Sequence, residues 1–240
     1  EPIHLFEHYA PNLRALGFVK SQAYALLGCS LLLAQGREAA FSAGWAAENG
    51  TKAEIVSWPQ LQMTGAQLAA QLQKAWQETD SKTWRWFESS LTYSNALVPW
   101  SLLLYGRAVK EAQWQSLGLA ALDFLAGKTM RDGMCQPVGC RGWWPETAKK
   151  GAVYDQQPLE AFEMLAASQE AWHLTGEMKY KQWAKAAFDW YKGRNTAGQS
   201  LLEPVSGGCY DGITAEGVNE NQGAESQIAW GLAWLFWQRQ

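Results

Sequence analysis

The 240-residue sequence lacks a strong charge of either sign, and this excludes one class of partner. The 20 Lys and Arg residues stand against 23 Asp and Glu residues, which gives a net charge of −3. A nucleic-acid-binding domain normally carries a basic patch or stripe that neutralises phosphates. Because no such stripe occurs here, we expect no nucleic-acid partner.

Long apolar runs are missing as well. The longest, YALLGCSLLLA and IAWGLAWLFW, both fall short of the roughly 20 residues that cross a bilayer. We therefore predict no membrane span, and we recognise no signal sequence at the N-terminus. Because the sequence begins with Glu1 rather than Met, we treat it as a piece of a longer chain.

Metal-ligating residues are scarce. The sequence has four cysteines and three histidines, and the C-x4-C spacing of Cys135 and Cys140 does not match the usual zinc motifs. We predict no metal site and no cofactor. Cys29 lies in an apolar helical segment and is expected in the core, whereas the other three cysteines lie in predicted loops. A disulfide between loop cysteines stays open as an alternative to reduced thiols, which are typical of a cytoplasmic protein.

Tryptophan, in contrast, is abundant, with 15 copies. Many of them occur at helical spacing and are predicted to lie in the core. Trp84, Trp86, Trp143 and Trp144 stand instead beside glycine, proline and charged residues in predicted loops. An exposed aromatic face suits a sugar ring, which stacks its C–H groups on the indole. Loop aromatics can equally close the ends of a helical core, so both interpretations are kept.

Hydrophobic periodicity predicts an all-α chain that forms a single domain over residues 1–240. Inner helices of an (α/α) toroid are covered all round, whereas outer helices keep one face in water. The sequence alternates in this way, and we predict a toroid that is incomplete relative to a six-hairpin barrel. The more apolar helices are expected at about 16–36, 95–109, 158–175 and 222–238, and the amphipathic ones at about 38–48, 65–79, 111–127 and 178–193.

Polar residues gather where the predicted inner helices begin. WFESSLTYSNA precedes one helix, YDQQPLEAFE opens the next and NENQGAES opens the last. The N-terminal ends of inner helices meet on one face of a toroid, so we expect these side chains to line one cavity. The loop over 131–154 is long for a compact domain, which is typical of functional or disordered segments. The candidates for substrate binding are Glu88, Tyr93, Asn95, Arg141, Trp143, Trp144, Gln156, Gln157, Asn219 and Gln222.

Paired carboxylates are the machinery expected if the chain cleaves a glycan. One carboxyl group protonates the glycosidic oxygen, and a second, about 5–5.5 Å or 6.5–9.5 Å away, attacks the sugar or activates water. The candidates for catalysis are Asp155, Asp211, Glu220 and Glu225. Helix capping is the alternative for any one of them. Capping does not account for Glu225, about one turn inside an apolar helix, or for Glu160 and Glu163, which share one face of another.

The blocks YDQQPLEA, AFDWYKGRN and GGCYDGITAEGVNENQGAES resemble a helical domain found beside, or fused behind, bacterial group-4 glycosyltransferase modules. WFESSLTYSNALVPWSLL and GCRGWWP look like further counterparts, so the resemblance covers about residues 20–240. It implies a relationship to the (α/α)6 toroids of six-hairpin glycosidases and sugar epimerases. The family is expected to carry Asp where this chain has Ser94, and Asn where it has Cys140.

Three hypotheses about function follow. The first is a glycoside hydrolase-like activity on an oligosaccharide or other glycan, carried out by paired carboxylates. The second is a non-catalytic glycan-binding companion of a glycosyltransferase module. The third is a structural helical domain, which predicts that Trp143 and Trp144 are buried against other protein. Sugar transfer by this chain alone is not expected, because no glycine-rich loop follows a strand.

Overall fold

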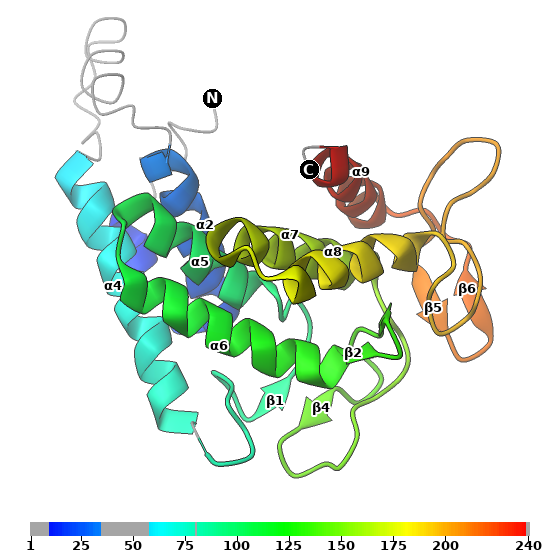
Figure 1. Cartoon of the computed structure of the whole chain (residues 1–240), viewed down its shortest axis with the longest axis horizontal. Coiled ribbons are helices and arrows are strands. Elements are labelled where there is room, and N and C mark those ends of the chain that lie inside the picture. The colour runs from blue at the N-terminus through cyan, green and yellow to red at the C-terminus, as the bar shows by residue number, and fades with distance from the viewer. Residues whose placement is uncertain (1–9, 35–57, 80, 239–240) are drawn as a thin grey trace, which may run out of the picture.

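The computed structural model describes residues 10–34, 58–79 and 81–238. Within these ranges the chain is mostly helical, which confirms the all-α prediction (Figure 1). No helix in these ranges combines the length and the apolar character needed to cross a membrane. The helix predicted at 38–48 lies outside the described residues. The helices are η1 (Ala10–Ala15, a 3-10 helix), α2 (Val19–Ala34), α4 (Trp58–Thr79), α5 (Leu97–Val109), α6 (Ala112–Thr129), α7 (Pro158–Thr175), α8 (Met178–Tyr191) and α9 (Ala224–Gln238).

The helices form two layers. In one layer α2, α5, α7 and α9 follow one another, each in contact with the next. In the other layer α4, α6 and α8 pack against α2, α5 and α7 respectively. The alternation of apolar and amphipathic helices along the sequence is therefore an alternation between the layers. In Figure 1, α4 and α9 lie toward opposite sides of the molecule, so the described helices form an open row and their closure into a toroid stays a prediction.

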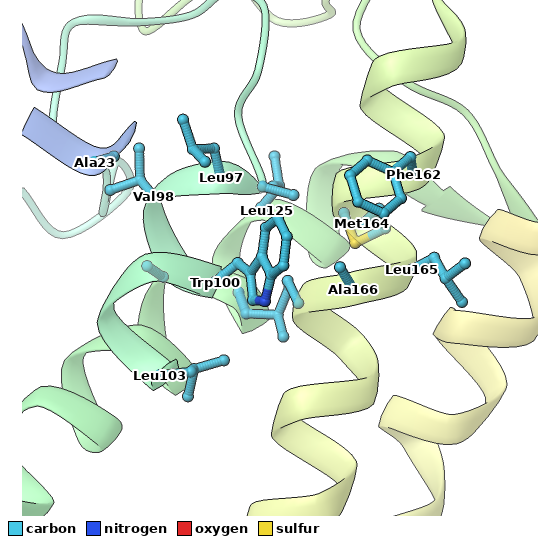
Figure 2. Packing of buried hydrophobic residues seen from close by; sticks show 14 of the residues in the cluster. Ala23, Leu97, Val98, Trp100, Leu103, Leu125, Phe162, Met164, Leu165 and Ala166 are labelled. Atoms are coloured by element: carbon cyan, nitrogen blue, oxygen red, sulfur yellow. The ribbon is translucent and has the colours of Figure 1, made fainter. Parts of the chain in front are cut away.

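One continuous cluster of buried side chains joins the layers. Trp100 of α5 belongs to it, and its ring meets Phe162 of α7 and Phe236 of α9 edge-on, with centroids 5.7 Å apart in both pairs. Figure 2 shows Trp100 between α5 and α7, beside Phe162. Neighbouring helices cover α5 and α7 on nearly every side, which explains why these two segments are so apolar.

The ends of α7 follow from its sequence. Pro158 occupies the first turn, where a backbone N–H would have no partner within the helix. At the other end Gly176 has a φ of 72° and donates its N–H to the carbonyl of Trp172. Glycine adopts this left-handed conformation at little cost, and its N–H satisfies one of the last carbonyls of the helix. The predicted boundaries, 158 and 175, match the structure.

Helix α4 begins earlier than predicted. The sequence predicted a helix from about residue 65, but α4 already begins at Trp58. Pro59 lies in its first turn, a position that proline favours. The buried stripe of Leu68 and Leu72 extends back to Leu61, which continues the helical repeat.

Short antiparallel strand pairs stand in the connections that lead into α5, α7 and α9. The predicted loop over 131–154 is therefore partly strand, and its Asp132–Gly133 turn, with φ values of 52° and 72°, is the typical signal of a tight hairpin. The pairs are β1 (Ser90–Leu91) with β4 (Trp144–Pro145), β2 (Met130–Arg131) with β3 (Met134–Cys135), and β5 (Gly212–Thr214) with β6 (Gly217–Asn219).

All four cysteines are free thiols. Cys29 is buried in α2, as predicted, and Cys135 and Cys209 are buried as well. Cys140 is half-buried beside the cleft described below. The alternative of a disulfide between loop cysteines is therefore wrong.

Candidate functional site

The connections into α7 and α9 meet at a polar cleft. Gln156, just before α7, and Ile213 of β5 exchange two backbone hydrogen bonds of 3.0 Å each. This bridge holds two distant parts of the chain together. The cleft beside it has a volume of about 410 Å³. Its polar lining includes Asp155, Gln157, Asp211, Thr214, Asn219 and Glu225.

Many of the predicted site residues therefore come together. Three of the four candidate catalytic carboxylates, Asp155, Asp211 and Glu225, line the cleft, and so do Gln156, Gln157 and Asn219 from the predicted binding set. Glu220 and Gln222 are exposed and do not line it. Glu88, Tyr93 and Asn95 belong instead to a neighbouring cluster around α7.

Asp155 is held by an arginine from the 131–154 loop. Its Oδ2 accepts a hydrogen bond of 3.0 Å from Nε of Arg141, while its Oδ1 is buried without a hydrogen-bond partner in the described part of the chain. Asp155 does not cap α7, because Gln157 occupies the N-cap position and makes no side-chain cap bond. Arg141, predicted to contact a ligand, thus contacts a candidate catalytic carboxylate.

Asp211 stabilises the start of α9. Its Oδ1 accepts hydrogen bonds from the Gly223 N–H at 2.7 Å and from the Ser226 hydroxyl at 2.6 Å. These are the contacts of a capping side chain, supplied by a residue far from the helix in sequence. Glu225 lies between the two groups that Asp211 binds, so Asp211 fixes the backbone that carries Glu225 to the cleft.

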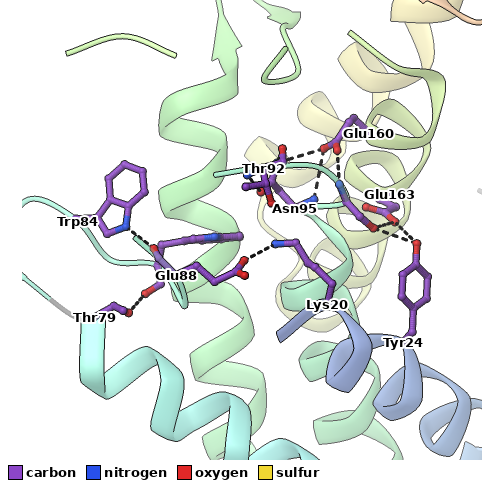
Figure 3. Close-up of polar contacts among 11 residues, drawn as sticks. Lys20, Tyr24, Thr79, Trp84, Glu88, Thr92, Asn95, Glu160 and Glu163 are labelled. Carbon is purple, nitrogen blue, oxygen red and sulfur yellow. Dashed lines mark hydrogen bonds and ion pairs between the residues drawn. The ribbon is translucent and has the colours of Figure 1, made fainter. Parts of the chain in front are cut away.

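Two glutamates are buried together at the N-terminal end of α7. Glu160 and Glu163 face the loop before α5 (Figure 3). Ser94 of that loop binds both: its N–H donates to Oε1 of Glu160, and its hydroxyl donates to Oε1 of Glu163 at 2.5 Å. Ser94 has a φ of 53°, which is uncommon for a residue other than glycine. In this conformation both of its donors face α7.

Asn95 is a support for this pair and is not available to a ligand. It is 1% exposed, and both its backbone N–H and its Nδ2 lie 3.4 Å from Oε2 of Glu160. It also closes its own loop through two hydrogen bonds with the backbone of Thr92. Neither Ser94 nor Asn95 caps α5, because Ala96 is the N-cap residue.

Burial favours the protonated forms of the two glutamates. It raises the pKa of Glu160 to about 7 and that of Glu163 to about 8, where the charge of Glu160 adds to the effect. The donors of Ser94 and Asn95 oppose the rise at Glu160. Lys20 also opposes it, but its Nζ is paired with Oε2 of Glu88 at 2.9 Å. Ionising two buried carboxylates side by side is costly, so burial favours the protonated form of each.

Tyr24 connects the buried pair to the surface. Its hydroxyl lies 3.1 Å from Oγ of Ser94 and 3.5 Å from Oε1 of Glu163, and the residue is 45% exposed. Burial of the phenol raises its pKa to about 12, and the negative charges of Glu163 and, to a smaller extent, Glu225 add to the rise. Glu225 also lines the cleft, whereas Tyr24 is not one of the residues that line it.

Sequence reasoning missed Tyr24 because its neighbours, ALLGC, are those of an ordinary core helix. It did single out Glu160 and Glu163 as two acids on one face of an apolar helix, and that signal led to this cluster.

Most of the loop tryptophans are part of the core. Trp84 and Trp86 are buried, and so is Trp144, whose Nε1 donates to the carbonyl of Ala148 at 3.0 Å. The prediction that Trp144 binds substrate is therefore wrong, because its indole is covered by its own chain. Trp143 is half-buried. The exposed aromatics beside the buried pair are tyrosines, namely Tyr24 and Tyr93.

A scan against protein-family models finds no match to this chain, and neither does a search of the curated proteins. Within the described ranges, no three His, Cys, Asp or Glu side chains gather in a way that could hold a metal ion. The chemistry of the site is therefore argued from its own side chains.

Proposed function

We propose that the chain is a carbohydrate-active domain that binds a glycan in the cleft and hydrolyses it as a glycosidase does. One observation carries the proposal: two connections distant in sequence place carboxylates and amides around one cleft of about 410 Å³. A sugar presents many hydroxyl groups, and each needs a directed donor or acceptor once water is displaced. Gln157, Thr214 and Asn219 supply such groups beside the acids.

Asp155 and Glu225 are the proposed catalytic carboxylates. Both line the cleft, and they come from different segments: Asp155 precedes α7, and Glu225 lies at the start of α9. The ion pair with Arg141 orients the Asp155 side chain, and a carboxylate in this position can attack a sugar or activate water. Asp211 has a positioning role in this proposal, because both partners of its Oδ1 belong to the start of α9.

The proposed fold is an arc of an (α/α) toroid. The order of the helices supports this, because the first halves of α2 and α7 meet the loop before α5 at the Tyr24, Ser94 and Glu163 contacts. The connections into α7 and α9 meet at the cleft. An oligosaccharide is the proposed substrate and a glycosyltransferase module the proposed partner. The free and mostly buried cysteines are consistent with a cytoplasmic location.

The test is turnover of a panel of oligosaccharides by the wild-type chain, by Asp155→Asn and by Glu225→Gln. Loss of a catalytic carboxylate should lower kcat by about 10²-fold or more. Glu216→Gln is the matched control, because Glu216 is an exposed acid in the β5–β6 turn and does not line the cleft. Its turnover should equal that of the wild type. Unchanged turnover in Asp155→Asn would remove that residue from the mechanism.

The alternative is a non-catalytic glycan-binding domain. One observation favours it: Asp155 and Asp211 are both engaged by protein groups, which leaves fewer carboxylate oxygens for a reaction. This alternative uses the same cleft. Calorimetry that shows saccharide binding, with no product over days of incubation, would establish it in place of hydrolysis.

A further inference from the structure

The outer layer carries a second hollow, on a part of the chain that the proposed hydrolysis does not use. This groove has a volume of about 410 Å³. The β2–β3 hairpin supplies Met130 and Gly133 to it, and β3 packs against α8. The other wall, from α8 and the segment after it, consists of Gln182, Trp183, Lys185, Ala186, Asp189 and Arg194. The AFDWYKGRN block thus contributes two side chains to the groove, those of Asp189 and Arg194.

We propose that this groove is a second saccharide-binding site, in which a sugar ring stacks on Trp183 and its hydroxyl groups bond to Gln182 and Asp189. The inference takes its class of ligand, an oligosaccharide, from the proposed function. It adds a site that binds the glycan and carries out no reaction on it.

Trp183 is a rigid surface for such a ring. Its indole meets Tyr180 edge-on, with centroids 5.2 Å apart, and Nζ of Lys179 lies 5.8 Å from its centroid. Tyr180 is itself fixed, because its hydroxyl donates to Oδ1 of Asp123 on α6 at 2.9 Å. The indole therefore has firm neighbours within the chain and still borders the groove. A rigid aromatic side chain loses little conformational entropy when a ligand stacks on it.

Arg194 joins the two walls of the groove. Its Nη2 donates to the carbonyl of Gly133 at 3.3 Å, which ties the hairpin turn to the end of α8. Its backbone N–H donates to the carbonyl of Asp189 at 3.1 Å, and its Nη1 lies 3.7 Å from Oδ2 of the same residue. The groove therefore has a defined shape before a ligand enters.

The charges of the groove favour a ligand with hydroxyl groups over an ion. Its lining carries Lys185 and Arg194 against Asp189, and both cations are paired with this one carboxylate, at 2.5 Å and 3.7 Å. The groove thus offers N–H donors and a carboxylate acceptor beside an indole, with one positive charge in excess. A sugar needs both kinds of polar partner for its hydroxyl groups and a flat apolar surface for its C–H groups.

The groove and the cleft lie beside the same segment after α8. Arg194 lines the groove, and two residues later the hydroxyl of Thr196 accepts a hydrogen bond of 2.7 Å from Nε2 of Gln156, which lines the cleft. A glycan held in the groove is therefore kept near the cleft, which raises its local concentration there.

The site can be located by magnetic resonance, without any turnover. In the full chain labelled with isotope at the indole nitrogens, the resonance that disappears in Trp183→Phe belongs to Trp183. The ligands are neutral hexasaccharides of glucose, of mannose and of N-acetylglucosamine. Titration of the wild type with this set should shift the Trp183 resonance in a saturable way with at least one of them.

Trp172 provides the matched control. Its indole is also half-buried, and Nζ of Lys181 lies 4.4 Å from its centroid, but it does not line the groove. Its resonance, identified in the same way by Trp172→Phe, should stay in place during the titration.

Gln182→Ala tests the polar contacts. Gln182 is exposed, so this variant should keep the wild-type fold, and its thermal melt checks that it does. The Kd that the Trp183 resonance reports should rise about threefold or more, because one hydrogen bond to the ligand is lost. Trp183→Ala should weaken the binding measured by calorimetry about tenfold, whereas Trp172→Ala should bind like the wild type.

A saturable shift at Trp183 that weakens in Gln182→Ala supports the second site. No shift at Trp183 with any of the hexasaccharides overturns it, and so does a shift of equal size at Trp172. Wild-type affinity in Gln182→Ala overturns the assigned contacts. Glycan turnover without a shift at Trp183 leaves the proposed hydrolysis standing and removes the groove, while a shift at Trp183 without turnover supports the groove and counts against hydrolysis.

Discussion

Replacing Glu163 with Gln should change how the stability of the chain depends on pH. In the folded chain burial raises the pKa of Glu160 to about 7 and of Glu163 to about 8, against an ordinary value of 4.5. At pH values between 4.5 and about 8, the folded chain therefore binds more protons than the unfolded chain. The stability that the pair contributes is therefore fully present below pH 4.5 and is lost as the pH rises through the folded pKa values.

The magnitude follows from the number of protons. Each extra proton held by the folded state makes the free energy of unfolding fall by about 1.4 kcal/mol per pH unit. Glu163→Gln removes one such proton, so its slope between about pH 5.5 and 7.5 should be shallower by that amount. The amide oxygen of Gln can still accept the hydrogen bond from Ser94, so the surrounding contacts are kept.

Urea unfolding followed by tryptophan fluorescence, at half-unit steps of pH, measures the slope. A constant m-value across the series shows that the same surface is exposed on unfolding. Glu216→Gln, an exposed acid on the β5–β6 turn, should keep the wild-type slope. Equal slopes in the wild type and in Glu163→Gln would mean that the folded chain holds no extra proton at Glu163, and the electrostatic account of the pair would be wrong.

Further predictions concern the core and the cleft. Trp100→Ala should lower the free energy of unfolding, measured in urea, by about 3–5 kcal/mol, because it leaves a cavity between α5, α7 and α9. Val205, which is 94% exposed, provides the control: Val205→Ala should unfold like the wild type. Equal losses in the two variants would contradict the packing. Gly139→Ala should strongly lower the stability of the chain in thermal melts, because a Cβ at this position would overlap the backbone of Tyr154. Gly127→Ala, with open space around its Cβ, should instead raise the free energy of unfolding by up to about 1 kcal/mol. Asp211→Ala should cost about 0.5–2 kcal/mol and speed amide exchange at the start of α9, and unchanged exchange there would refute its capping role.

Short-range chemistry decided which parts of the fold could be predicted. Pro158 and Gly176 mark the ends of α7 because proline and glycine act through their own backbone angles. The Asp132–Gly133 turn depends on backbone angles in the same way, although the sequence analysis predicts only a long loop there. The burial of Trp144 was not predictable, because it depends on how its loop folds back: Ala148 accepts a hydrogen bond from the indole, and Gly151 packs against the ring.

The sequence by itself determined the helices, the alternation between their layers and the segments in which polar residues gather. Each of these depends on residues a few positions apart. Only the tertiary structure decided which side chains meet. It turned Arg141 toward Asp155, gave α9 its cap from Asp211, left Glu220 outside the cleft and placed Tyr24 and Ser94 against Glu163. The physical reason is that a hydrogen bond between distant segments depends on how whole helices pack, and that packing is set by the shared core.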